Sequence, residues 1–158
     1  MTAQDSQARI HASLVAALRE DGSRGGVLLF GEPGAGKSDI ALQMIDNGAL
    51  LVADDQVDLV FGDGGLWGSA PEKIAGLIEA RGIGLLRLPF QARVRVALAV
   101  TLKPGANVER MPARVWYQPP EGFRARGGAL RIPHVTLDPR ESGAAAKIAL
   151  AVYGRIEG

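Results

Sequence analysis

Short apolar runs separated by polar, glycine-containing segments dominate the first part of the chain. The runs at 10–17 and 26–30 are joined by a polar segment, so the pattern predicts a strand hairpin, although the first run is also short enough for a helix. Apolar residues then recur at helical spacing over 37–47 and stop before Gly48, which favours a helix with a glycine C-cap. A short buried strand follows at 50–53. These elements predict a βαβ unit preceded by a hairpin.

The second half of the chain has a more varied pattern. Its expected elements are a hairpin over 56–67 that turns at 62–65, a helix over 71–80 opened by a capping box at Ser69 and Glu72, strands over 95–102 and 130–137, and a closing helix over 144–153. We expect residues 1–9 to be flexible and residues 10–154 to form one domain. The predicted class is α/β, a mixed sheet with hairpins and flanking helices.

Composition narrows the function without identifying it. The 158 residues carry 18 basic and 17 acidic side chains, which nearly cancel, and the sequence has no block of basic residues. Nothing in the charge therefore indicates a surface that binds nucleic acid or membranes. The sequence has no cysteine, which excludes thiol catalysis and fits a reducing compartment. No stretch reaches membrane-spanning length and the N-terminus has no apolar signal core, so the cytoplasm is the expected location.

A glycine-rich segment between the strand at 26–30 and the helix at 37–47 is the most informative motif. Its residues are Gly31, Glu32, Pro33, Gly34, Ala35, Gly36, Lys37 and Ser38. In this setting glycines let backbone N–H groups surround a phosphate, the lysine ammonium reaches the β and γ oxygens, and the hydroxyl of Ser38 can bind Mg²⁺. The segment therefore predicts a nucleoside triphosphate site with a P-loop.

Two consecutive carboxylates follow the strand at 50–53. Asp54 and Asp55 come 17 and 18 residues after Lys37, so we expect their strand to lie close beside the strand that leads into the glycine-rich loop. Neighbouring residues at a strand end point to opposite sides, so one carboxylate can face a metal ion and the other a nucleophile. The pair predicts phosphoryl transfer to a hydroxyl group.

These residues and a later segment resemble a known family. Ala53-Asp-Asp-Gln-Val57 and Ile78-Glu-Ala-Arg-Gly-Ile-Gly84 are similar to the motifs of HPr kinase/phosphorylases. The resemblance covers roughly residues 11–150 and implies a fold similar to the nucleotide domain of phosphoenolpyruvate carboxykinase. It suggests the short, catalytic-domain form found in alphaproteobacteria.

The resemblance also implies roles for single residues, matched by position. Lys37 and Ser38 would hold ATP and Mg²⁺, and Asp54 would be the general base. Ser38, Asp55 and Glu79 would form the metal shell. The remaining roles are Arg81 for neutralising the transferring phosphate, His11 for tuning the proton affinity of the aspartate, and Arg140 as a secondary catalytic candidate.

The implied activity is phosphorylation by ATP of a serine in the phosphocarrier HPr or its nitrogen-branch paralogue, with phosphorolysis of the product by inorganic phosphate as a second activity. Such a protein would regulate the bacterial phosphotransferase system and form homo-oligomers, hexamers in the family. Two alternatives remain open at this point. One is a non-catalytic ATP-binding sensor or scaffold, and the other is a small-molecule kinase or simple ATPase.

Overall fold

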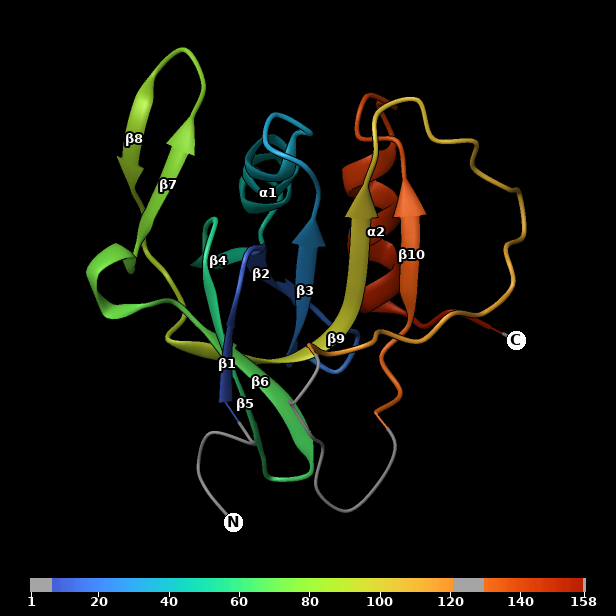
Figure 1. Cartoon of the computed structure of the whole chain (residues 1–158), viewed down its shortest axis with the longest axis horizontal. Helices are drawn as coiled ribbons and strands as arrows, with labels where there is room; N and C mark the ends of the chain where they lie inside the picture. The colour runs from blue at the N-terminus through green and yellow to red at the C-terminus, as the bar shows by residue number, and fades with distance from the viewer. Residues whose placement is uncertain (1–6, 121–129, 158) are drawn as a thin grey trace.

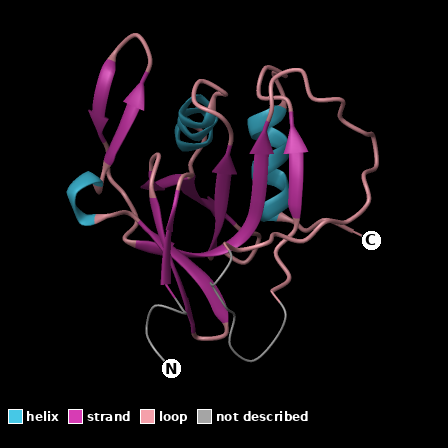
Figure 2. Cartoon of the chain, viewed as in Figure 1, coloured by secondary structure: helices cyan, strands magenta, loops and turns pink. Residues whose placement is uncertain are grey.

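The computed structural model describes residues 7–120 and 130–157 of the chain. Strands outnumber helices in this part, which has two α-helices and one short 3-10 helix (Figure 2). The elements are β1 (Gln7–Ile10), β2 (Ser13–Leu18), β3 (Arg24–Phe30), α1 (Lys37–Asp46), β4 (Leu50–Ala53), β5 (Val57–Gly62), β6 (Gly65–Ser69), η2 (Glu72–Ile74), β7 (Leu77–Ala80), β8 (Gly84–Arg87), β9 (Arg93–Leu102), β10 (His134–Leu137) and α2 (Ala144–Tyr153).

One mixed sheet organises the molecule, with strands in the order β1-β5-β6-β9-β3-β2-β4 and β10 added beside β9 (Figure 1). The ten-residue strand β9 joins its two halves. The first residues of β9 pair antiparallel with β6, and the rest pairs in parallel with β3 on one side and β10 on the other. The hairpin β7–β8 is a separate two-stranded sheet.

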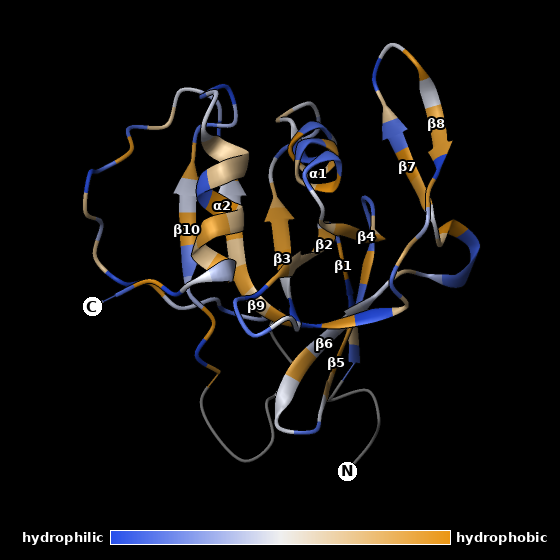
Figure 3. Ribbon diagram, turned by 180° about the vertical axis from the view of Figure 1, so that it is seen from behind, coloured by the Kyte–Doolittle hydropathy of each residue, from blue (hydrophilic) through white to orange (hydrophobic). Residues whose placement is uncertain are grey.

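Two apolar clusters lie on opposite faces of this sheet. Helices α1 and α2 cover one face, where Ile40 and Ile148 pack against strand residues such as Leu29 and Val100 (Figure 3). The other cluster lies on the opposite face. There, side chains of β2 and β3 pack against side chains of β5 and β6, where the sheet curls. Side chains of β2, β3 and the second half of β9 therefore contribute to the clusters on both faces, which explains why these segments are mostly buried.

The predicted neighbourhood of β4 was wrong in one respect. Strand β4 does not pair with β3, because β2 lies between them and is antiparallel to both. Both β3 and β4 consequently run in the same direction, and their carboxyl ends reach the same edge of the sheet. The glycine-rich loop and Asp54 still meet at that edge, as expected of an α/β site.

The predicted helix over 71–80 was also wrong. Only Glu72–Ile74 forms a single 3-10 turn, and Leu77–Ala80 is strand β7. Gly76 has φ +80°, which ends the turn and redirects the chain. Side chains then alternate, with Ile78 fully buried and Glu79 exposed, and this period of two is that of a strand.

Smaller boundaries also differ. The hairpin β2–β3, the hairpin β5–β6 and both α-helices are confirmed, and the run at 10–17 is strand rather than helix. Residues 7–9, expected to be flexible, lie in β1 and pair with β5, while residues 1–6 lie outside the described part. The last strand begins only at His134. Across residues 7–120 and 130–157, neither helix has the length and apolar character needed to cross a bilayer.

Candidate active site

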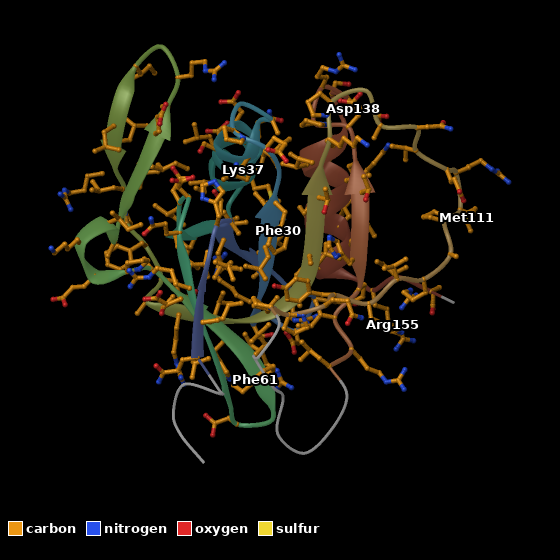
Figure 4. The ribbon with its side chains drawn as sticks, in the orientation of Figure 1. Phe30, Lys37, Phe61, Met111, Asp138 and Arg155 are labelled. Atoms are coloured by element: carbon orange, nitrogen blue, oxygen red, sulfur yellow. The ribbon has the colours of Figure 1, made fainter. Side chains whose placement is uncertain are left out.

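A cavity of about 610 Å³ opens at the edge of the sheet where the glycine-rich loop, the end of β4 and the hairpin β7–β8 meet. It brings together most of the residues that the sequence singled out: His11, Pro33, Gly34, Gly36, Lys37, Ser38, Asp54, Asp55, Glu79 and Arg81. The predicted loop residues Gly31, Glu32 and Ala35 do not line it. Figure 4 shows Lys37 at this end of the molecule, above the carboxyl end of β3. The cavity therefore joins residues from four separate segments of the chain.

The glycine-rich loop owes its path to its glycines. Gly34 and Gly36 have φ of +82° and +108°, in a region that other residues rarely adopt. A Cβ at Gly31 would lie 2.9 Å from both the Cβ of Ala35 and the carbonyl oxygen of Leu102, so the loop is closely packed at its start. The Nζ of Lys37 donates a hydrogen bond of 2.9 Å to the carbonyl oxygen of Gly31. The side chain of Lys37 therefore folds back across the loop to its first residue.

Asp54 is the most strongly bonded carboxylate of the cavity. Its Oδ1 accepts hydrogen bonds from the hydroxyl of Ser38 at 2.9 Å and from the hydroxyl of Ser13 at 2.8 Å. Its Oδ2 accepts a third, of 3.1 Å, from the backbone N–H of Glu79. Asp54 is only 8% exposed. The carboxylate consequently connects the helix start, strand β2 and strand β7.

Asp55 has a different environment. Its φ of +71° lies in the left-handed region, where aspartate is tolerated better than most residues, and this turns the chain sharply after Asp54. The side chain is 63% exposed, and its Oδ1 lies 3.3 Å from Nε2 of His11. The two carboxylates therefore have different partners, Ser38 for Asp54 and His11 for Asp55, although both line the same cavity.

Glu79 and Arg81 reach the cavity from the hairpin β7–β8 rather than from a helix end. Glu79 lies in β7, and Arg81 begins the turn to β8. Both line the cavity on the side facing the glycine-rich loop, together with Leu77 and Leu85. Two apolar side chains thus share this wall with one carboxylate and one guanidinium.

Arg140 lies outside the lining of the cavity, as far as the described residues define it. Its guanidinium donates to the carboxylate of Asp138, with Nη2 at 3.0 Å from Oδ2. This bond, together with the N–H groups of Arg140 and Gly105, lowers the pKa of Asp138 to about 2. Pro139 lies between them and approaches Gly36, where a Cβ would be 3.4 Å away. The turn at 138–140 therefore packs against the glycine-rich loop at Gly36.

Ser13 is a site residue that the sequence reasoning missed. It is 1% exposed, and its hydroxyl both donates to Asp54 and accepts a bond of 3.2 Å from the N–H of Asp55. The signal available in the sequence was a single hydroxyl residue at the head of an otherwise apolar run. A buried polar side chain in such a run needs a partner, and here the partner is the acidic pair.

An aromatic cluster supports the end of β3 below the loop. Phe30 stacks on Tyr117 with ring centroids 5.6 Å apart, and His134 completes the cluster while sharing a hydrogen bond of 2.8 Å with Thr101. Burial raises the pKa of Tyr117 to about 12 and lowers the pKa of His134, because both charged forms lose hydration. His134 is therefore structural, as its sequence context indicated.

The oxygen ligands of the cavity suit a hard cation but do not form a closed cage. Within residues 7–120 and 130–157, no three acidic or histidine side chains gather closely enough to enclose a metal ion by themselves. Mg²⁺ commonly keeps several waters and takes one or two carboxylates plus phosphate oxygens. Ser38 and Asp54, 2.9 Å apart, offer an incomplete oxygen set of this kind.

Comparison with known proteins places these features in a family. The model of the HPr serine kinase C-terminal domain matches residues 5–103, which include the loop, the acidic pair and the hairpin β7–β8. An HPr kinase/phosphorylase of Clostridium botulinum is 44% identical over 80 residues, which are 51% of this chain and 25% of that protein. One from Acidovorax is 40% identical over 102 residues, covering 60% of this chain and 32% of the relative.

The fold has a solved counterpart as well. The Hpr(Ser) kinase/phosphatase from Coxiella burnetii superposes with a TM-score of 0.70 at 24% identity, covering 90% of this chain and 93% of the other. This likeness supports the same mixed α/β arrangement. The chain spans about a quarter of the length of the first curated relative that it matches.

Proposed function

This chain belongs to the family of the HPr serine kinase C-terminal domain, and we propose that it transfers the terminal phosphoryl group of ATP to a serine of HPr or of a related phosphocarrier. The observation that carries the proposal is the convergence of the glycine-rich loop, the bonded pair Ser38 and Asp54, and the accessible pair Asp55 and His11 in one cavity. A cavity with only the first of these features would bind a nucleotide without moving its phosphate.

The loop residues would bind the nucleotide. Phosphate oxygens would take the place of the Gly31 carbonyl as the partner of Lys37 Nζ, and the backbone N–H groups around Gly34 and Gly36 would surround them. Ser38 and Asp54, with Glu79 nearby, would hold Mg²⁺, which supplies charge neutralisation to the phosphates. Arg81 adds a positive charge from the opposite wall of the cavity.

The contacts favour a division of roles between the two aspartates that differs from the one the family resemblance suggested. Asp54 already accepts three hydrogen bonds and is nearly buried, so it is suited to orienting Ser38 at the metal. Asp55 is exposed and has His11 beside it. We therefore assign proton acceptance from the substrate serine to Asp55, with His11 holding that carboxylate in position.

The same residues serve the reverse reaction. In phosphorolysis, an oxygen of inorganic phosphate attacks the phosphorus of phosphoserine, the bond between phosphorus and the serine oxygen breaks, and pyrophosphate forms. The serine oxygen then needs a proton, which Asp55 returns with His11 as its neighbour. Asp55 would thus accept the proton in one direction and donate it in the other.

The test begins with the wild-type chain, Mg²⁺-ATP and purified HPr, followed by intact-mass and fragment mass spectrometry of the carrier. A phosphoserine supports the proposal, and an unmodified carrier beside measurable ATP binding contradicts it. Asp55→Asn should lower the transfer rate at least about a hundredfold while ATP binding persists. Asp54→Asn should weaken Mg²⁺-ATP binding as well as transfer. The opposite pattern would restore Asp54 as the base.

Other expectations remain predictions. They concern the nitrogen-branch carrier, the hexameric assembly, the cytoplasmic location, the extent of the domain and the similarity to phosphoenolpyruvate carboxykinase. The non-catalytic sensor gains no support from the cavity, because a scaffold has no need of the accessible Asp55 and His11 pair.

A further inference from the structure

The hairpin β7–β8 has two unlike faces. Strand register places Ile78 opposite Leu86, and this face packs into the core beneath α1. Glu79 stands opposite Leu85 on the other face, which lines the cavity. The core face fixes the hairpin to the body, and the cavity face presents an apolar side chain beside a carboxylate.

A hydrogen bond joins the hairpin β7–β8 to the carboxylate of Asp54. The backbone N–H of Glu79 donates to Oδ2 of Asp54 at 3.1 Å. Ile83, at the turn, follows Glu79 by four residues. Because the chain reverses over 81–83, with the N–H of Ile83 donating to the carbonyl oxygen of Ala80 at 3.0 Å, Ile83 lies at the end of the hairpin, just beyond the paired residues Ala80 and Gly84. Figure 1 shows the hairpin standing apart from the main sheet on the same side as the start of α1.

The turn exposes apolar side chains in a manner that its sequence enforces. Gly82 and Gly84 have φ of +88° and +125°, so the chain reverses sharply and carries Ile83 outward. Ile83 is 78% exposed and Leu85 is 67% exposed. Scattered exposed apolar residues are ordinary, but Leu85 lines the cavity, Ile83 lies two residues away, and Arg81 and Arg87 are exposed on the same hairpin, so together they form a small patch with a defined position.

We propose that this patch, Ile83 and Leu85 at the end of the hairpin β7–β8, is a docking surface for the folded protein that carries the acceptor serine. The inference rests on the proposed kinase function. A serine on a folded protein enters the cavity only if the surrounding protein surface comes to rest on the rim. Leu85 of the hairpin lines this cavity, and Ile83 is exposed two residues before it in the chain. The partner should therefore have an apolar patch close to its serine, with acidic groups facing Arg81 and Arg87.

The test compares three variants with the wild type. Ile83→Ser and the double variant Ile83→Ser with Leu85→Ser remove the patch, while Leu150→Ser removes an equally exposed leucine, 66% accessible, from α2. The probes are HPr for kinetics and a serine-to-alanine form of HPr for binding by fluorescence anisotropy in the presence of Mg²⁺-ATP.

We expect Ile83→Ser to weaken carrier binding several-fold and the double variant to weaken it about tenfold or more, each lowering kcat/KM for the carrier in parallel. The KM for ATP in Ile83→Ser and all constants in Leu150→Ser should stay within about twofold of wild type. Carrier affinity unchanged in the double variant overturns the proposal. So does a loss confined to ATP affinity, which would assign the patch to the nucleotide base. A change of oligomeric state in Ile83→Ser, measured by light scattering, would assign it to a second copy of the chain. A wild-type chain that phosphorylates no carrier overturns the proposed function instead, and this inference with it.

Discussion

Removing the hydroxyl of Ser13 tests the geometry of the site without assuming its activity. In Ser13→Ala, Asp54 loses a buried donor at 2.8 Å, and the part-buried N–H of Asp55 loses its acceptor. A hydrogen bond to a charged group is worth about 1.5–3 kcal/mol, and a newly unsatisfied backbone N–H adds to the loss. Since Ser38 and Glu79 still bond to Asp54, we expect a decrease of about 2–4 kcal/mol in the free energy of unfolding.

The assay is urea unfolding followed by circular dichroism. With an m-value of about 2 kcal/mol/M, the midpoint should fall by about 1–2 M. Ser23→Ala is the matched control, because its hydroxyl also bonds to a carboxylate, Asp21 at 2.6 Å, but in an exposed turn. We expect less than about 0.5 kcal/mol there. A loss below about 0.5 kcal/mol in Ser13→Ala would refute the reasoning that Ser13 holds the acidic pair in place.

Three further predictions test separate parts of the molecule. Gly68→Ala places a Cβ 2.4 Å from Cδ2 of the buried Leu14 and should lower the free energy of unfolding by about 1–3 kcal/mol. In the control Gly62→Ala the new Cβ meets nothing within 4 Å, so stability should stay the same or rise slightly, and equal urea midpoints for the two variants would contradict this. Burial lowers the pKa of His134 in the folded state, so the unfolded state binds the proton first as pH falls below about 6.5, and stability declines. His134→Gln should therefore lose less stability than the wild type between about pH 8 and pH 5.5. Parallel curves of stability against pH for the two proteins would refute the buried, neutral state of His134. Lys37→Met should weaken ATP binding at least about tenfold by calorimetry with an unchanged circular dichroism spectrum, and affinity close to wild type would remove Lys37 from the phosphate site.

Local patterns in the sequence were sufficient for the loop and its flanking elements. Glycines at 34 and 36 permit the positive φ that the loop adopts there, and the apolar spacing of 37–46 is helical. These features depend on residues that are neighbours in the chain, which is where single-sequence reasoning is strongest.

The errors concern information that lies elsewhere in the chain. Residues 71–80 carry an apparent capping box and an apolar pattern compatible with a helix, but pairing with β8 and burial of Ile78 against α1 decide the strand. The place of β4 depends on whether β2 inserts beside it, which no local pattern reveals. Ser13 gained a role only because β2 runs next to Asp54. Tertiary contacts override local propensity in each case.

The position of β9 has a consequence for the order in which the chain is built. Its residues 93–102 pair with β3, β6 and β10, so until they leave the ribosome β3 has only β2 as a sheet partner. A nascent chain that ends before Arg93 also lacks Leu98 and Val100, against which α1 and α2 pack, and Leu102, whose carbonyl packs against Gly31. Contacts so distant in sequence form slowly and together. The nucleotide site should therefore appear late in synthesis and in a single step, and nascent chains stalled at residue 92 should show no ATP-dependent protection from proteolysis.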